Sequence, residues 1–185
     1  MIKEKYVRPA ILADALELAP KMKAEDRAEI LASNNASPLK ALVEPFTYEK
    51  GKIYSIIGTK DEGVIGMFGC CPSQLPEYGV VWLLSSNDLY KHTRQFLKEC
   101  PRWVDEMSQG FEYIYNFVDS RNWKTLKWLQ FLGFEPKEKI EKYGHGKLPF
   151  LLMMKELNKQ KNVWCSYSIE NRNSDIFSSK SKSSC

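Results

Sequence analysis

Hydrophobic residues recur at helical spacing in four stretches of the 185-residue chain. In the first stretch, Leu12, Leu16 and Ala19 share one face, and Pro20 interrupts the pattern. A period near 3.6 residues predicts amphipathic helices. The expected helices cover residues 12–19, 24–32, 89–109 and 123–132, with one further turn at 39–43. Pro101 is expected to kink or split the third of them.

The other apolar segments are short, rich in β-branched and aromatic residues and bounded by turn residues, which is typical of strands. Residues 78–84 are apolar almost throughout and predict a central strand that is buried on both faces. Further strands are expected at residues 3–8, 52–57, 64–70, 112–118, 134–142 and 147–157. The resulting order, β–α–α–β–β–β–α–β–α–β–β, predicts an α/β (α+β) domain.

The composition changes near residue 158. Residues 158–185 are rich in Ser, Asn and Lys and show no sustained hydrophobic period. Such a segment cannot bury enough apolar surface to form a core. We therefore expect one domain at residues 1–157 and a polar, flexible C-terminal tail at 158–185. The alternative is a tail that docks on the domain or on a partner through its apolar residues, which are Trp164, Tyr167, Ile169 and Phe177.

Charge and cysteine content exclude several classes of protein. The net charge of +4 is modest and the basic residues are dispersed, which does not favour a nucleic-acid partner. The five cysteines include no Cys-x-x-Cys pair and have only His92 and His145 to join them, so we expect reduced thiols and no metal site. The sequence shows no secretory signal and no apolar run of membrane-spanning length, so we expect no membrane span.

A motif at residues 122–134 carries the most specific information. Asn122 is suited to cap the helix that follows, and Thr125 comes three residues later. Gly133 permits the left-handed conformation that ends a helix, and Phe134 is expected to fill the core.

Together with the element order, this motif resembles the GCN5-related N-acetyltransferase (GNAT) fold. The resemblance implies a mixed central sheet of six to seven strands flanked by about four helices. Its fourth and fifth strands would be parallel and splayed, with acetyl-CoA between them if the protein is active. Glu77, at the mouth of the fourth strand, is the candidate catalytic base. The candidate cofactor-binding residues are Leu83, Leu84, Ser85, Ser86 and Asn122.

Two positions depart from the pattern of active members of this fold. The usual phosphate-binding loop contains glycines, whereas residues 85–90 contain none, and Asp88 adds a negative charge there. Leu129 stands where a tyrosine commonly serves as the general acid.

Residues 6–157 also resemble a narrower group, the acetyltransferase-like internal virion protein A or head-assembly proteins of short-tailed bacteriophages. The matching segments are residues 7–10, 25–30, 66–69, 82–84, 116–122, 128–129 and 132–134. This resemblance implies a location in the host cytoplasm or in the virion, with a virion or host protein as partner.

These observations leave three hypotheses. The departures from the pattern favour a phage protein that has degraded catalysis and acts in assembly of the virion head or internal core, or early in infection. The alternative is an active acetyl-CoA-dependent N-acetyltransferase that acts on an amine of a small molecule or a protein. A nucleic-acid-associated factor that uses the basic tail is the weakest of the three.

Overall fold

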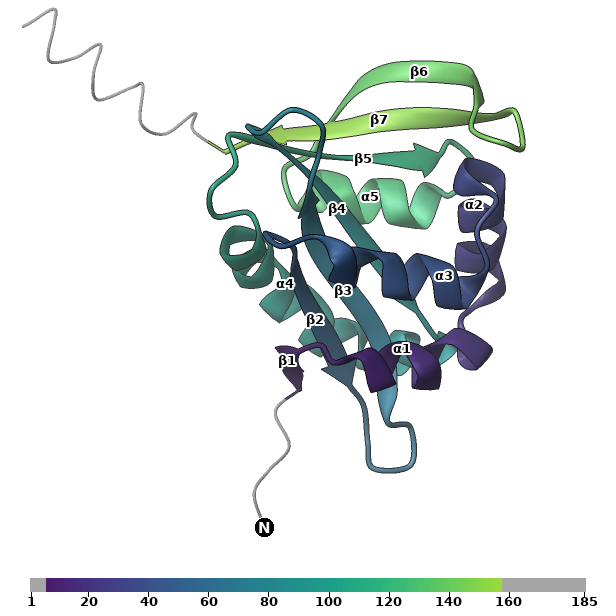
Figure 1. The fold of residues 1–185 in the computed structure, drawn as a ribbon, viewed down its shortest axis with the longest axis vertical. Coiled ribbons are helices and arrows are strands. Elements are labelled where there is room, and N and C mark those ends of the chain that lie inside the picture. The colour runs from purple at the N-terminus through teal and green to yellow at the C-terminus, as the bar shows by residue number, and fades with distance from the viewer. Residues whose placement is uncertain (1–5, 158–185) are drawn as a thin grey trace, which may run out of the picture. The chain divides into compact units, whose positions relative to one another are not determined.

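Seven strands in the described part of the chain, residues 6–157, form one mixed sheet in this computed structural model (Figure 1). The sheet order is β1-β2-β3-β4-β5-β7-β6, with β4 and β5 parallel. The strands are β1 (Val7–Pro9), β2 (Lys52–Ile57), β3 (Val64–Pro72), β4 (Tyr78–Ser85), β5 (Tyr113–Asp119), β6 (Glu135–Tyr143) and β7 (Leu148–Glu156). The mixed α/β class and the number of strands are therefore confirmed. The predicted tail and the start of the first predicted strand lie outside the described residues.

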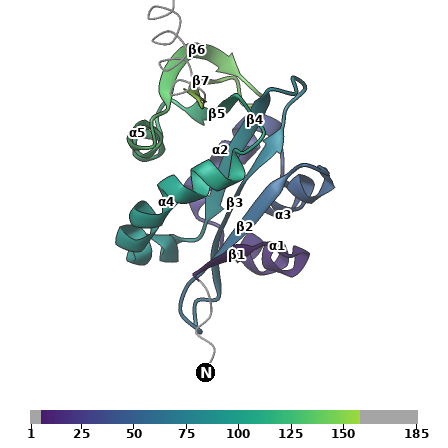
Figure 2. The same cartoon turned by 90° about the vertical axis from the view of Figure 1, so that its left-hand side faces the viewer.

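Helices cover both faces of this sheet. Figure 2 shows α4 and α5 on one face, and α1 and α3 on the other. The α-helices are α1 (Leu12–Leu18), α2 (Ala24–Asn34), α3 (Pro38–Val43), α4 (Thr93–Met107) and α5 (Trp123–Phe131). Short 3-10 helices occupy Ala19–Lys21, Glu44–Thr47 and Asn87–His92. Within residues 6–157, no helix is both long and apolar enough to cross a membrane.

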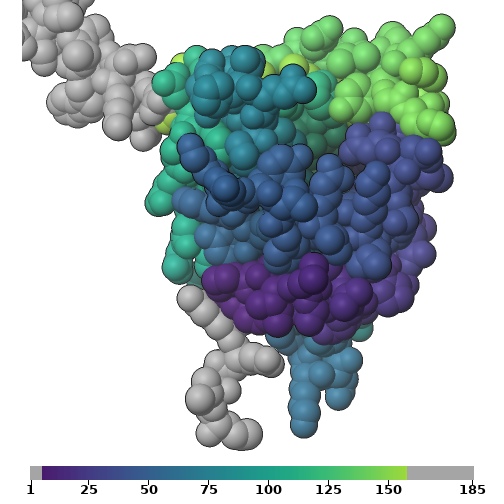
Figure 3. Space-filling view, viewed as in Figure 1, coloured from purple at the N-terminus to yellow at the C-terminus, as the bar shows by residue number. Residues whose placement is uncertain are grey.

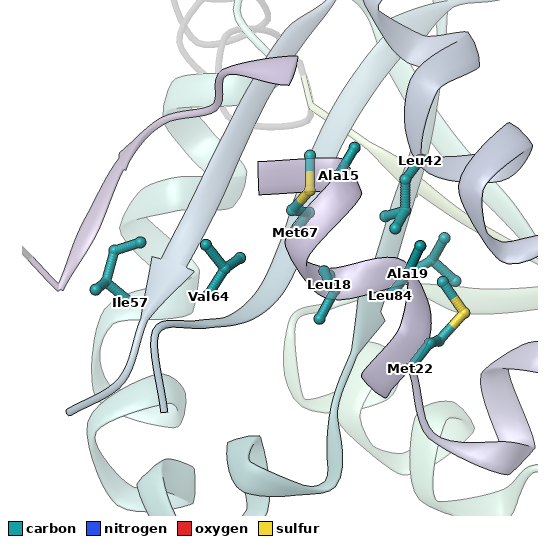
Figure 4. Close-up of a cluster of buried hydrophobic side chains, with 9 residues drawn as sticks. All are labelled: Ala15, Leu18, Ala19, Met22, Leu42, Ile57, Val64, Met67 and Leu84. Atoms are coloured by element: carbon teal, nitrogen blue, oxygen red, sulfur yellow. The ribbon is translucent and has the colours of Figure 1, made fainter. Parts of the chain in front are cut away.

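Helices α1 and α3 pack against the sheet through a cluster of buried apolar side chains (Figure 4). Leu18 of α1 and Leu42 of α3 are fully buried, as is Met67 of β3. Burial of each such side chain stabilises the fold by roughly 1.5–3 kcal/mol. On the opposite face, the ring of Trp103 from α4 packs 4.9 Å from that of Tyr54 on β2. The sheet therefore has a core on each face.

Strand β4 lies at the centre of the sheet, but the prediction that it is buried on both faces is wrong for part of its length. Trp82 and Leu83 are only partly buried. The reason is that β5 pairs only with residues 78–80 of β4, after which the two strands diverge. The side chains beyond that point have no neighbouring strand on one side.

Pro101 does not split α4, which runs without interruption from Thr93 to Met107 and follows a 3-10 helix instead of beginning near Leu89. A proline removes the N–H that would bond to the carbonyl four residues earlier. That carbonyl, on Leu97, instead accepts a hydrogen bond from Cys100 Sγ at 3.6 Å. The helix therefore continues past the proline without leaving this acceptor unsatisfied.

The start of helix α2 is tied to the end of β4. Asp26 accepts a hydrogen bond from the backbone N–H of Ser85 at 2.8 Å. The backbone N–H of Lys23 donates to the carbonyl of Ser85 at 2.9 Å. Both bonds connect backbone that lies far apart in the sequence, so they fix where α2 begins over the sheet.

The end of α2 is held by the turn between β6 and β7. The backbone N–H groups of His145 and Gly146 donate to the carbonyls of Ser33 and Ala32, at 3.2 and 2.7 Å. These carbonyls belong to the last turn of α2, where helical carbonyls lack partners within the helix. Figure 3 shows the β6–β7 hairpin against α2 on the molecular surface.

We expect Gly144→Ala to destabilise the protein by about 2–4 kcal/mol, because Gly144 combines φ +61° with a site where a Cβ would clash with the carbonyl oxygen of Ser33. Gly110 is the matched control, since it has φ +98° and open space around a Cβ. Gly110→Ala should therefore cost only about 1 kcal/mol. Urea denaturation measures both values, and equal losses would contradict the close contact between this turn and α2.

Candidate functional site

Three hollows meet where β4 and β5 part. The fork cavity, of about 80 Å³, lies between the strands and α4 and α5; its lining includes Val81, Leu84, Cys100 and Leu129. The α4–α5 hollow, of about 620 Å³, is lined by residues that include Tyr90, Phe96, Trp123 and Trp128. The α3 hollow, of about 260 Å³, is lined by residues that include Glu44, Tyr48, Cys71 and Phe117. Glu29 and Leu83 line all three.

Glu29 projects from α2 at the open end of the fork. Its Oε2 accepts a hydrogen bond from Nδ2 of Asn122 at 2.9 Å. Burial raises the pKa of Glu29 to about 7; the hydrogen bond from Asn122 and the charge of Lys23 oppose this rise, whereas the charges of Asp26 and Asp119 add to it. A carboxyl group that titrates near neutrality can remove a proton from an amine at physiological pH.

Asn122 connects this carboxyl group to α5. Its Oδ1 accepts from the backbone N–H of Thr125 at 3.3 Å, which confirms the predicted helix cap. The other predicted features of the motif are also confirmed, since Gly133 has φ +85° and Phe134 is buried. Both ends of the Asn122 amide are thus engaged within the chain, and its role in binding cofactor stays a prediction.

Three of the predicted site residues lie together at the fork, whereas the predicted base, Glu77, lies apart from them. Leu83, Leu84 and Asn122 all line the fork cavity. Glu77 is exposed, precedes β4 and lines none of the three hollows. Its backbone carbonyl accepts hydrogen bonds at the start of β5, the end where the two strands are still paired. Glu77 and the fork residues therefore lie at opposite ends of the strand pair.

Ser85 and Ser86 are buried and line none of the three hollows. The backbone N–H of Ser86 donates to the carbonyl of Ile65 at 2.9 Å, and that of Ser85 donates to Asp26. The hydroxyl of Ser86 accepts from the backbone N–H of Asp88 at 3.2 Å. The backbone amides of Ser85, Ser86 and Asp88 are thus already bonded within the chain. The assignment of both serines to the cofactor stays a prediction.

Two further side chains of the fork cavity bear on acid catalysis. Leu129 is buried there and has no proton to donate. The hydroxyl of Tyr6 is buried without a hydrogen-bond partner among the described residues, and Tyr6 also lines the cavity. Burial, followed by the charge of Glu99, raises the pKa of Tyr6 to about 12, so this hydroxyl stays protonated at neutral pH.

The sequence pattern did not single out Glu29 as a site residue, although it lies within the predicted helix at residues 24–32. A signal was present in the spacing, because Asp26 and Glu29 lie three residues apart and share a helix face with Ile30. Two carboxylates on an apolar face are unusual, since such groups are seldom buried without partners. The partners, Ser85 and Asn122, come from distant parts of the chain.

The α4–α5 hollow contains three basic residues in different electrostatic settings. Arg121 forms an ion pair with Asp119 at 2.6 Å. Lys23 lies 3.3 Å from Asp26. Lys124 has no carboxylate partner among residues 6–157, and its Nζ lies 5.0 Å from the centre of the exposed Tyr90 ring. Among the three basic residues of this hollow, Lys124 is therefore the one without an ion pair to a described residue.

Comparisons with known proteins agree with this geometry. Ribosomal-protein-S5-alanine acetyltransferase from Vibrio fischeri matches with a TM-score of 0.60 and 20% identity over 85% of this chain and 97% of that chain. A GNAT-family acetyltransferase from Streptococcus pneumoniae matches with a TM-score of 0.56 and 16% identity over 82% and 98%. A Bacillus subtilis acetyltransferase in complex with CoA matches with a TM-score of 0.56 and 10% identity over 82% and 97%.

No protein-family model and no curated protein matches the sequence. At these identities the structural similarities establish the fold alone. The parallel pair β4–β5, open beyond residue 80 and followed by the capped helix α5, is the arrangement that the resemblance implied. The chain has the GNAT acetyltransferase fold.

Proposed function

We propose that this protein is an acyl-CoA-dependent N-acyltransferase in which Glu29 is the general base. The observation that carries the proposal is the placement of this carboxyl group, which has a pKa of about 7 and lines hollows on both sides of the fork. An acyl donor in one hollow and an amine in the other could meet beside it. Proximity of this kind, with a correctly poised base, is the basis of direct acyl transfer.

The α4–α5 hollow suits acetyl-CoA. Phe96 and Trp128, whose ring centres lie 5.5 Å apart, offer apolar surface beside the fork for the pantetheine arm. Lys23 and Lys124 offer positive charge for phosphates. Because the amides of Ser86 and nearby residues have acceptors within the chain, we assign the phosphate contacts to these lysines. Acetyl-CoA would supply the activated acyl group.

Within this proposal the backbone of Leu83 and the amide of Asn122 orient the reacting groups at the fork. Glu29 accepts a proton from the acceptor nitrogen, directly or through a water molecule. The nitrogen forms a bond to the acyl carbon as the carbon–sulfur bond breaks, and the thiolate takes its proton from solvent. Asn122 donates to the carboxylate throughout and so keeps Glu29 oriented towards the acceptor.

A second candidate is a phage protein with degraded catalysis that acts in head or internal-core assembly, or early in infection, through a virion or host protein. Two observations favour it, namely the bonded amides near Ser86 and the buried Leu129 in place of an acid. Calorimetric titration with acetyl-CoA separates the two functions. Binding supports the enzyme, whereas no binding at millimolar cofactor, with co-purification of the protein with virions, supports the assembly role.

We expect Glu29→Gln to lower kcat by about 10²–10⁴-fold while leaving the Kd of acetyl-CoA unchanged, because only the proton acceptor is lost. In the wild type, kcat/KM should rise with pH through about 7 as Glu29 ionises. Glu77→Gln is the informative comparison, since Glu77 is the alternative base. Retained activity in Glu29→Gln with loss in Glu77→Gln would reverse the assignment.

The same substitution should stabilise the protein at high pH. Because the pKa of Glu29 rises from 4.5 to about 7 on folding, its favourable contribution is complete below pH 4.5 and is lost as pH rises through 7. Glu29→Gln can still accept from Asn122 but cannot ionise. We therefore expect it to be more stable than the wild type by about 1–2 kcal/mol at pH 8 and equal at pH 4.5, by urea denaturation. Glu138→Gln, an exposed control, should show no pH-dependent difference.

Lys124→Ala should raise the Kd of CoA by about 3–10-fold, because it removes the basic side chain of the α4–α5 hollow that has no ion pair within residues 6–157. The loss should shrink at high salt, where charges are screened. Lys127→Ala provides the control, since Lys127 lies on the same helix over the Trp123 ring and does not line the hollow. Calorimetry measures both constants, and equal effects would exclude Lys124 as a phosphate contact.

A further inference from the structure

The α3 hollow carries only negative side-chain charge. Among its described lining residues, the charged ones are Glu29 and Glu44, and no Lys or Arg is present. The α4–α5 hollow differs, since it contains Lys23, Arg121 and Lys124 in addition to three acidic residues. The two hollows lie on opposite faces of the sheet, because α4 and α5 cover one face and α3 covers the other (Figure 2). With acetyl-CoA assigned to the α4–α5 hollow, the amine acceptor would bind in the α3 hollow, whose charge favours a positively charged ligand.

Glu44 lies at the rim of the α3 hollow, in the first turn of the 3-10 helix Glu44–Thr47. It is exposed, and its carboxylate has no hydrogen bond or ion pair with any residue in the range 6–157. Glu29, in contrast, is partly buried and is held by Asn122. The hollow thus has one oriented carboxyl group at the fork and one free carboxylate at its entrance.

The walls between these two carboxyl groups are largely aromatic and aliphatic. Tyr48, Trp82 and Phe117 line the hollow together with Val80 and Leu84. Aromatic faces attract ammonium groups and also pack against methylene chains. The volume of about 260 Å³ is near the lower end of the usual range for small-molecule pockets, which favours a small ligand.

We propose that the acceptor is a small dibasic amine, an alkyl chain with an ammonium group at each end. The proposal rests on the acyltransferase function above. The reacting ammonium group lies at Glu29 and gives it one proton to become a neutral amine. As the nitrogen bonds to the acyl carbon and the carbon–sulfur bond of the donor breaks, the nitrogen releases a second proton to solvent and the thiolate takes one up. The second ammonium group remains charged and pairs with Glu44. Glu44 is thus a specificity-determining residue that does not touch the reacting atoms.

Steady-state kinetics with acetyl-CoA test this inference on a matched pair of acceptors, 1,5-diaminopentane and pentylamine. We expect the wild type to favour the diamine by about tenfold in kcat/KM. Glu44→Gln should raise the KM of the diamine by about tenfold with little change in kcat, and should leave pentylamine unaffected. Glu49→Gln is the control, because Glu49 is exposed nearby and does not line the hollow.

Calorimetric binding of the diamine to the wild type and to Glu44→Gln provides a readout that does not depend on catalysis. Diamine binding that Glu44→Gln weakens supports the inference. Equal use of the two amines, an equal effect of Glu44→Gln on both, or preferred acetylation of a peptide N-terminus overturns the dibasic acceptor and leaves the acyltransferase intact. Failure to bind acetyl-CoA or to acetylate any amine overturns the acyltransferase itself.

Discussion

One hydrogen bond, from Asn122 to Glu29, joins the two helices that flank the open end of the fork. The two residues are 93 positions apart in the sequence, so this bond forms only when α2 and α5 are both in place. Asn122 is fixed by its own capping bond to the start of α5. A carboxyl group held in this way has a defined position relative to Leu83 and to both hollows. The chemistry that we propose depends on that position more than on any other contact.

The neighbouring carboxyl group of Asp26 serves a different purpose, although it lies on the same helix face. Burial raises the pKa of Asp26, but Lys23 and the backbone N–H of Ser85 favour its charged form. Its oxygens are therefore committed to fixing α2 over the end of β4. Within the described part of the chain, Glu29 has a single amide donor, and it faces open space, so its proton is free to exchange. Two carboxyl groups in different environments thus divide the structural and chemical roles.

Local patterns were enough to predict most of the elements, because periodicity and turn residues act over a few positions. The motif ending in Gly133 and Phe134 then identified the fold. The predictions that failed concerned features that depend on contacts between distant segments. The half-burial of Leu83 follows from the divergence of β5, and the bonded amide of Ser86 follows from its pairing with Ile65. Glu29 was missed for the same reason, since its partner is Asn122.

Asp88 and Leu129 depart from the pattern of active members of this fold. The structure gives reasons why neither residue prevents acyl transfer. Asp88 does not line the α4–α5 hollow, and its carboxylate pairs with Lys91 at 2.7 Å. Lys91 therefore partly compensates the charge of Asp88, and that charge lies outside the hollow proposed to bind the phosphates. Leu129 removes one proton donor, but a thiol of pKa near 8.5 leaves readily as a thiolate, so acid catalysis is the less critical half of the reaction. The amine must lose a proton to react, and Glu29 is placed to accept it.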